Sequence, residues 1–166
     1  MPDVPLMIRP AAPPDIEVLV SLRAHLLDGM SEASYASRTS EASRQWKAAY
    51  RPWLAQILEG GERSRIVVAD RCGEVVGCAT ALIDHRPPAP DCLSGRSGWV
   101  QSVVVSPAWR GQGIAERLIR DLLQWFAECS VSKVMLETTP MAEMLYRKLG
   151  FVRSSESLLS FSGGRP

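Results

Sequence analysis

One stretch of the sequence decides the fold: residues 99–126 read WVQSVVVSPAWRGQGIAERLIRDLLQWF. Its first part, residues 99–105, is an apolar, β-branched run of strand length, and Pro107 closes it because proline cannot donate to a β-ladder. Its last part places two apolar rows at helical spacing: Ile114, Leu118, Leu122 and Phe126, and beside them Ala115, Ile119 and Leu123. The stretch therefore predicts a strand, a turn and a helix with one broad buried face. Glu116 and Arg120 are predicted to form an ion pair on its wetter side.

The turn between strand and helix contains two glycines, in Arg110-Gly111-Gln112-Gly113. Glycine lets the backbone turn tightly and leaves no Cβ atom to obstruct a ligand. The amides that open the helix lack intrahelical acceptors and carry the positive end of its dipole. Such a turn indicates a site for an anion, most often phosphate, to which Arg110 adds a charge. A plain connecting turn is the alternative, and the six-residue dinucleotide fingerprint is excluded because Glu116 replaces its third glycine.

Two motifs give the sequence a family resemblance. Residues 103–115, VVVSPAWRGQGIA, resemble the acetyl-CoA signature of the GNAT superfamily of N-acetyltransferases. Residues 145–151, LYRKLGF, resemble the C-terminal Leu-Tyr-x-Lys-x-Gly-Phe block of the same family. The resemblance implies an α/β (α+β) fold of the GNAT type. Its sheet would be mixed, mostly antiparallel and twisted, with six to seven strands and helices on both faces.

The resemblance also implies the cofactor site, which would hold acetyl-CoA across the central strand and no metal. The pantetheine amides would pair with the backbone of Val103 and Val105, and the amides of residues 111–116 would hold the pyrophosphate. The implied cofactor-binding residues are Val103, Val104, Val105, Arg110, Gly111, Gln112, Gly113, Ile114, Ala115, Glu116 and Thr139. Thr139 is a departure from the family pattern, because many members carry an asparagine there, which reaches further than threonine.

Tyr146 is the predicted catalytic residue, as the acid that meets the departing CoA sulfur. A cysteine-like thiol has a pKa near 8.5 and a phenol near 10, so proton transfer from phenol to thiolate costs only about 2 kcal/mol. A dry site that disfavours the thiolate lowers that cost further. From the residues alone, a core tyrosine on an apolar helix face is the alternative. The LYRKLGF context favours the catalytic role.

The sequence offers no clear general base. Glu137, at the end of an expected strand, and Asp84 and His85, where a strand enters a loop, are candidates, with surface roles as the alternative. A lysine-like amine needs about 4.6 kcal/mol to be neutral at pH 7, whereas an α-amine needs about 1 kcal/mol. We therefore expect direct attack on the thioester, in a ternary complex, by a primary amine that either has a low pKa or is deprotonated through water. The expected acceptor is a small molecule or a peptide.

Two other functions fit the same residues. A non-catalytic acyl-CoA-binding or sensing module would keep the cofactor groove without turnover, and Thr139 leaves room for it. A nucleotide-binding α/β domain would use the turn at Gly111 and Gly113, and ATP or NAD would then stabilise the protein instead of CoA.

Length and composition fit one globular domain over residues 1–166, with 46% hydrophobic and 22% charged residues. A net charge of +1 argues against nucleic acid or an anionic membrane as a partner. No apolar run has bilayer length and no signal-peptide pattern opens the chain, so a cytoplasmic location is expected. The four cysteines form no Cys-x-x-Cys pair, which argues against a metal site and disulfides. A homodimer is possible, since members of the family often pair.

The remaining elements follow from periodicity and from turn residues. Strands are expected at residues 6–9, 66–70, 75–84 and 133–138, and a closing hairpin at 151–153 and 158–161. Helices are expected from Pro13 to Gly29, over residues 40–58 with a kink or split at Pro52, and over residues 140–149 with Gly150 as cap. Residues 30–39 and 85–98 are expected as loops. The first two helices and the second loop would form the wall of the acceptor site.

Overall fold

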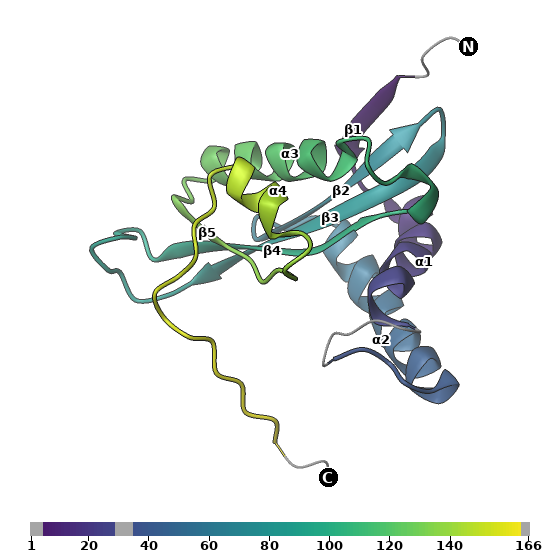
Figure 1. Ribbon diagram of the computed structural model, residues 1–166, viewed down its shortest axis with the longest axis horizontal. Coiled ribbons are helices and arrows are strands. Elements are labelled where there is room, and N and C mark those ends of the chain that lie inside the picture. The colour runs from purple at the N-terminus through teal and green to yellow at the C-terminus, as the bar shows by residue number, and fades with distance from the viewer. Residues whose placement is uncertain (1–4, 29–34, 164–166) are drawn as a thin grey trace.

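The computed structural model describes residues 5–28 and 35–163, which form a twisted five-stranded sheet with helices on both faces (Figure 1). The strands, in their order across the sheet, are β1 (Leu6–Pro10), β2 (Ser64–Arg71), β3 (Glu74–His85), β4 (Arg96–Val105) and β5 (Lys133–Met135). Strands β1 to β4 are joined by antiparallel ladders, whereas β5 pairs with β4 in parallel. The helices are α1 (Ile16–Leu27), α2 (Ser40–Leu58), α3 (Ile114–Glu128) and α4 (Glu143–Lys148), with short 3-10 turns at Pro13–Asp15 and Pro107–Trp109.

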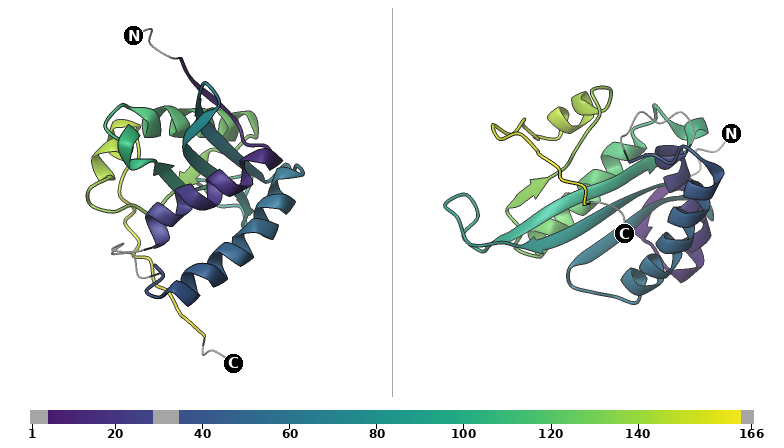
Figure 2. Two further views of the ribbon diagram at one scale, coloured as in Figure 1. Left: turned by 90° about the vertical axis from the view of Figure 1, so that its right-hand side faces the viewer. Right: turned by 90° about the horizontal axis from the view of Figure 1, so that it is seen from below.

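The sheet lies between α3 on one face and α1 with α2 on the other (Figure 2). Side chains alternate between the two faces along a strand. On β2, Val67 and Ala69 pack in the cluster of α3, while Ile66 and Val68 pack in the cluster of α1 and α2. Both faces of this strand are therefore buried, which explains its continuous apolar run in the sequence.

Helix α3 buries the face that its spacing predicted. The row Ile114, Leu118, Leu122 and Phe126 is at most 3% exposed. In the second row Ile119 is fully buried, and Ala115 and Leu123 are half-buried. Glu116 and Arg120 form the predicted ion pair, with 2.9 Å between carboxylate and guanidinium. The four residues of the first row pack in one hydrophobic cluster with residues of β2, β3 and β4.

Strand β4 begins at Arg96 rather than at Trp99, so the loop expected over residues 85–98 is shorter than predicted. The difference comes from Gly98, which looks like a loop residue in the sequence but lies inside the strand. A Cβ atom at this position would lie only 2.7–2.9 Å from ring atoms of Phe126. Glycine is therefore required here because α3 packs directly against the strand backbone.

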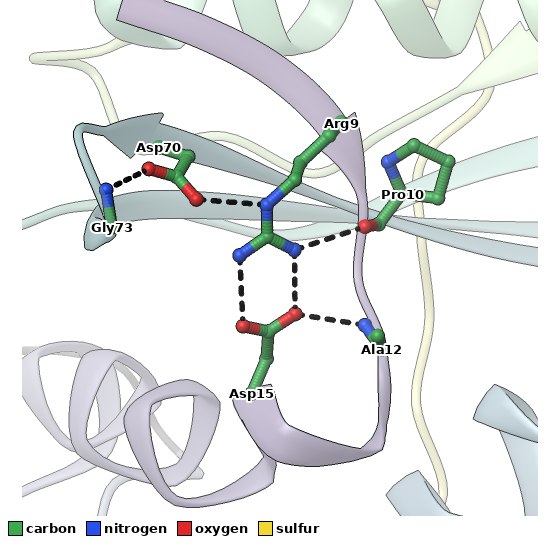
Figure 3. A network of polar contacts seen from close by, with 6 residues as sticks. All are labelled: Arg9, Pro10, Ala12, Asp15, Asp70 and Gly73. Carbon is green, nitrogen blue, oxygen red and sulfur yellow. Dashed lines mark hydrogen bonds and ion pairs between the residues drawn. The ribbon is translucent and has the colours of Figure 1, made fainter.

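Arg9 ties three segments of the chain together (Figure 3). Its Nε donates to Asp70 at the end of β2 (2.8 Å), and its two terminal nitrogens donate to Asp15 (2.8 and 3.0 Å). Asp15 also accepts from the amide of Ala12, and Asp70 from that of Gly73 in the β2–β3 turn. The Asp15 and Asp70 side chains are only 10% and 12% exposed. The hydrogen bonds from Arg9 lower the pKa of both carboxyl groups.

The prediction of six to seven strands was wrong, because the sheet of the described residues has five. Residues 151–153 and 158–161 form no strand, and the chain runs away from the body there (Figure 1). Strand β5 ends at Met135 rather than near residue 138, so the last edge of the sheet is short. Without a ladder partner the terminal segment leaves Val152, Leu159 and Phe161 between 88% and 95% exposed.

Two smaller differences concern the helices. Helix α4 begins at Glu143, later than predicted. Helix α2 runs unbroken through Pro52, because this proline is exposed and water can bond the carbonyl that it leaves without a donor. The expected end of the first helix at Gly29 and most of the expected loop at 30–39 lie outside the described residues. No helix within the described ranges is both long and apolar enough to cross a bilayer.

Candidate active site

Strand β4 parts from its neighbour partway along. Its ladder with β5 covers only residues 97–99, paired with 133–135. Beyond Trp99, the edge of β4 that faces β5 has no ladder partner among the described residues. On the other edge, the register with β3 shifts between Cys78 and Thr80, and Ser102 opposite takes a φ of 53°. Such a bulge bends a strand and ends regular pairing. The result is an open strand edge in the middle of the molecule.

Along the three valines after the bulge, the backbone groups alternate between the two edges of β4 and the side chains alternate between the two faces of the sheet. The amide of Ser106 donates to Val76 on β3, so by alternation the backbone of Val104 faces β3. The N–H and C=O groups of Val103 and Val105 therefore face the open edge. The Val104 side chain is buried in the cluster of α1 and α2, whereas Val103 and Val105 pack against the cluster of α3. The side chain of Arg110 closes the far end of the edge, where its Nε donates to the Val105 carbonyl (3.1 Å).

The open edge leads into the glycine bend. Gly111 and Gly113 have φ angles of 76° and 74°, in the left-handed region that favours glycine. A Cβ atom added at either position would meet no atom within 4 Å, so open space lies in front of the backbone. Gly113 is the N-cap of α3 and Ile114 anchors the helix in the core, while Gln112 is exposed. The bend is thus a cradle of backbone at a helix N-terminus, which suits a diphosphate.

Glu116 connects the start of α3 to the end of α4. Its carboxylate pairs with Lys148 (2.7 Å) and with Arg120 (2.9 Å). Hydrogen bonds from Lys148 and Arg120 lower the pKa of Glu116. This side chain is therefore occupied by two cations and holds the two sequence motifs next to each other, while its neighbour Ala115 is half-buried in the helix.

Tyr146 lies on α4 and is only 8% exposed. Its ring packs edge-on against Phe151, with 5.9 Å between the ring centres. Burial raises the pKa of its phenol, so the hydroxyl stays protonated at neutral pH. No residue in the described part of the chain accepts from or donates to this hydroxyl. Thr139 is exposed in the segment before α4, where its carbonyl accepts from the amide of Ala142 (3.1 Å).

Two cavities lie along the same part of β4. The larger, of about 520 Å³, is lined by residues that include Asp84, Trp99, Gln101 and Glu137. The smaller, of about 240 Å³, is lined by Arg23, Leu26, Leu27, Tyr35, Trp99, Val100, Gln101, Ser102 and Glu137. Trp99, Gln101 and Glu137 belong to both. Tyr146 and the residues of the glycine bend line neither cavity, so the bend and the cavities are separate parts of the site.

The structure distinguishes the candidate bases. Glu137 lines both cavities, is exposed, and forms no ion pair within the described ranges. Asp84 lines the larger cavity but pairs with Arg86 (3.0 Å), and a hydrogen bond from Arg86 lowers its pKa. His85 is exposed and lines neither cavity. Glu137 is therefore the carboxylate that the cavities leave available.

Sequence reasoning missed Arg23, which points into the smaller cavity from α1. A single arginine among the leucines of a helix gives no signal in one sequence. Trp99 was assigned only to a strand, although its side chain lines both cavities. The first two helices form part of the expected wall, through Ile57 and Arg23 among others, but no described residue of the expected loop at 85–98 lines either cavity, and strands β3 and β4 supply residues in its place.

Comparison with known proteins agrees with this geometry. The model of the Acetyltransferase (GNAT) family matches residues 27–151. A glucosamine 6-phosphate N-acetyltransferase of Trypanosoma brucei brucei is 33% identical over 103 residues, which cover 59% of this chain and 67% of that protein. N-acetyltransferase 8F1 of Mus musculus is 35% identical over 96 residues, covering 56% of this chain and 41% of the mouse protein. The chain thus spans less than half of the length of that relative.

Solved structures share the fold over nearly the whole chain. A GCN5-related N-acetyltransferase of Ralstonia eutropha superposes with a TM-score of 0.78 at 22% identity, covering 96% of this chain and all of that one. A predicted acetyltransferase of Clostridium acetobutylicum, solved with acetyl-CoA, gives 0.76 at 20% identity, with coverage of 95% and 96%. The family match extends over most of the sequence, including the open edge of β4, the glycine bend and α4. The chain therefore belongs to the acetyltransferase (GNAT) family of N-acetyltransferase enzymes.

Proposed function

We propose that this protein transfers an acetyl group from acetyl-CoA to the primary amine of a small acceptor. The observation that carries the proposal is the open edge of β4 leading into the bend at Gly111 and Gly113. The edge offers the amides of Val103 and Val105 and the carbonyl of Val103, while the Val105 carbonyl accepts from Arg110, and the bend offers unobstructed amides at a helix N-terminus. The Clostridium neighbour solved with acetyl-CoA supports this choice of ligand.

The cofactor would be held mainly by backbone. Val103 and Val105 would pair with the pantetheine amides, as an added strand pairs with a sheet edge. The amides of residues 111–116 would bind the diphosphate, with Arg110 beside them. Thr139 would contact the pantetheine part of the cofactor. The open space in front of Gly111 and Gly113 is what such a contact needs. When bound, acetyl-CoA supplies an activated acetyl group as a thioester.

Two protons must move in this reaction: the attacking amine loses one, and the departing sulfur gains one. The acceptor amine attacks the acetyl carbonyl, a C–N bond forms and the C–S bond breaks. Glu137 would take the proton that the amine loses, directly or through a water, because it lines both cavities and has no cation partner within the described ranges. Tyr146 would give its proton to the departing sulfur. Burial keeps its phenol protonated, so the acid form is ready at neutral pH.

The acceptor is proposed as a small amine, for which the cavities of about 520 and 240 Å³ have room. The trypanosome relative is named for glucosamine 6-phosphate, which makes amino sugars the first acceptors to test. An aminoglycoside N-acetyltransferase with bound CoA also shares the fold, at a TM-score of 0.73 and 20% identity. Aminoglycosides are therefore added to the panel of acceptors.

A thiol-release assay with acetyl-CoA and a panel of amines, with products read by mass, tests the proposal. Turnover with at least one amine, accompanied by a product heavier by one acetyl group, is the expected result. Tight CoA binding by calorimetry without turnover on any amine would favour the non-catalytic binding module instead. Stabilisation by ATP or NAD and not by CoA in a melting screen would favour the nucleotide-binding alternative.

A further inference from the structure

We infer that Arg23 binds an anionic group of the acceptor, so that the preferred substrate is a small amine that also carries a phosphate or carboxylate. The inference rests on the proposed transferase function and names the class of acceptor for the same site. Its basis is the arrangement of charge in the smaller cavity, where Arg23 and Glu137 both contribute to the lining without forming an ion pair.

Arg23 is fixed in place at the mouth of the bulge. It lies on α1, is half-buried, and donates from Nη1 to the hydroxyl oxygen of Ser102 (2.6 Å). Ser102 is the residue with a φ of 53°, where the register of β4 shifts. The arginine therefore reaches from the helix layer to the strand that would carry the cofactor, and it lies on the wall of the cavity in which the acceptor would bind.

The aromatic ring of Tyr50 also contacts the Arg23 guanidinium. The Arg23 guanidinium carbon lies 4.7 Å from the ring centre of Tyr50, within range of a cation–π contact. Tyr50 is buried, stacks on Trp53 with 5.7 Å between ring centres, and contacts Trp46 at 6.0 Å. The aromatic residues of α2 thus serve as core and also orient a charged side chain above them. The contacts with Ser102 and Tyr50 use part of the five N–H donors of the guanidinium, and the donors that remain can bind an oxoanion.

The charge of Arg23 is unmatched by the described part of the chain. Nearby carboxylates on the same two layers already have partners: Glu17 pairs with Arg51 (2.8 Å), and Asp28 with Lys47 (2.8 Å). No carboxylate of the described residues pairs with Arg23. Glu137, across the cavity, is likewise free of an ion pair there. The cavity therefore holds a positive and a negative group that are kept apart, which matches a molecule with an anion at one end and an amine at the other.

A purely structural role for Arg23, as a clamp on the bulge, makes a different prediction and is the alternative to exclude. The test compares kcat/KM for matched acceptors that differ only in the anion. Glucosamine 6-phosphate and glucosamine test for a phosphate, and 4-aminobutyrate and its amide test for a carboxylate. The wild-type protein should prefer the anionic member of one pair by about 10- to 100-fold, as expected for a charge-assisted bidentate contact.

Three variants separate recognition from structure. Arg23→Gln should remove most of the preference for the anion while leaving the neutral acceptor nearly unaffected. Ser102→Ala removes the clamp but keeps the guanidinium, so the preference should persist. Arg51→Gln, an exposed arginine on the neighbouring helix, is the matched control for loss of a positive charge and should leave the preference unchanged.

A second readout is independent of turnover. The acetylated anionic product should raise the melting temperature of the wild-type protein more than its neutral counterpart, and Arg23→Gln should lose this difference. If Arg23→Gln does not fold, Arg23→Lys, which keeps the charge but not the fork, should show a reduced preference. Equal use of anionic and neutral acceptors by the wild type would overturn the inference but leave the transferase function standing. Absence of thiol release with every amine would instead reject the transferase function.

Discussion

The two sides of the proposed site differ in the groups that they would offer to a ligand: backbone groups on one side and side chains on the other. On the proposed cofactor side, the open edge of β4 and the bend at Gly111 and Gly113 would present backbone groups to the ligand. On the proposed acceptor side, the two cavities would present side chains, with Trp99, Gln101 and Glu137 shared between them. A backbone site is specified by strand, glycine and helix start, whatever side chains surround it. A side-chain site depends on single residues from distant parts of the chain.

This contrast predicts how variants divide. Changes on the acceptor side and at the acid should act on turnover or on the choice of amine. Changes in the bend should act on the affinity for acetyl-CoA alone. Three predictions test the division, from the largest effect on activity to the smallest, and a fourth concerns a network outside both sides of the site.

Replacing Tyr146 by Phe should lower kcat by about 100- to 1000-fold, the range expected for loss of a positioned general acid. The binding of CoA, measured by calorimetry, should stay the same, because the ring and its contact with Phe151 are kept. Since burial raises the phenol pKa, wild-type kcat should show no decline caused by this group until the pH exceeds about 10. An unchanged kcat for the variant would return Tyr146 to a core role.

Replacing Glu137 by Gln should lower kcat by about 100-fold at neutral pH, as for loss of a general base. The matched control is Asp84→Asn, a carboxylate on the wall of the larger cavity that is already paired with Arg86. We expect kcat of the control to change by less than about 2-fold, because an exposed pair of this kind contributes little. Equal losses in the two variants would show that general charge in the cavity matters, and not a base at Glu137.

Replacing Gly113 by Ala should raise the KM for acetyl-CoA by about 10-fold, because a methyl group would occupy the space that a diphosphate needs and would weaken one charge-assisted hydrogen bond. Gly73→Ala in the β2–β3 turn is the matched control. Gly73 also has a left-handed φ, of 89°, and open space around a Cβ atom. Both variants should lose about 1–2 kcal/mol of stability from backbone strain. A rise in KM in both would mean that strain, not contact, governs affinity.

Replacing Asp15 by Asn should leave kcat/KM unchanged, because the Arg9 network lies outside both cavities (Figure 3). The free energy of unfolding at pH 7 should fall by about 2 kcal/mol, as for loss of charge-assisted hydrogen bonds at a buried carboxylate. The lowered pKa of Asp15 means that its contribution is complete above the ordinary value near 4 and is lost as the pH falls through the folded value. Thermal melts of the wild type should therefore drop below about pH 4, and the drop should be smaller for the variant.

The same contrast explains what could be predicted from the sequence. The bend, α3 and the buried rows from Ile114 to Phe126 follow from local rules of periodicity, glycine and proline, and the structure has them where expected. Gly98 was misjudged because its role is set by the ring of Phe126, far away in the chain. The base and Arg23 depend on which side chains meet in the folded molecule. No pattern in a single sequence contains that information.

The C-terminal segment shows the same limit for strands. Residues 151–153 and 158–161 have the composition of strands, but a strand also needs a partner, and the three-residue β5 gives them none. Three of their apolar side chains, Val152, Leu159 and Phe161, are therefore 88% to 95% exposed. The homodimer expected from the family resemblance stays a prediction, which light scattering at several protein concentrations would test.

The open edge of β4 makes it possible to observe ligand binding by hydrogen exchange. Neighbouring amides in this strand face opposite ways, with Val104 toward β3 and Val103 and Val105 toward the open edge. Hydrogen exchange along the strand should thus alternate between slow and fast from one residue to the next. An occupant of the edge would slow only the fast set, so the strand contains its own internal reference: Val104 reports the integrity of the sheet, and its two neighbours report occupancy.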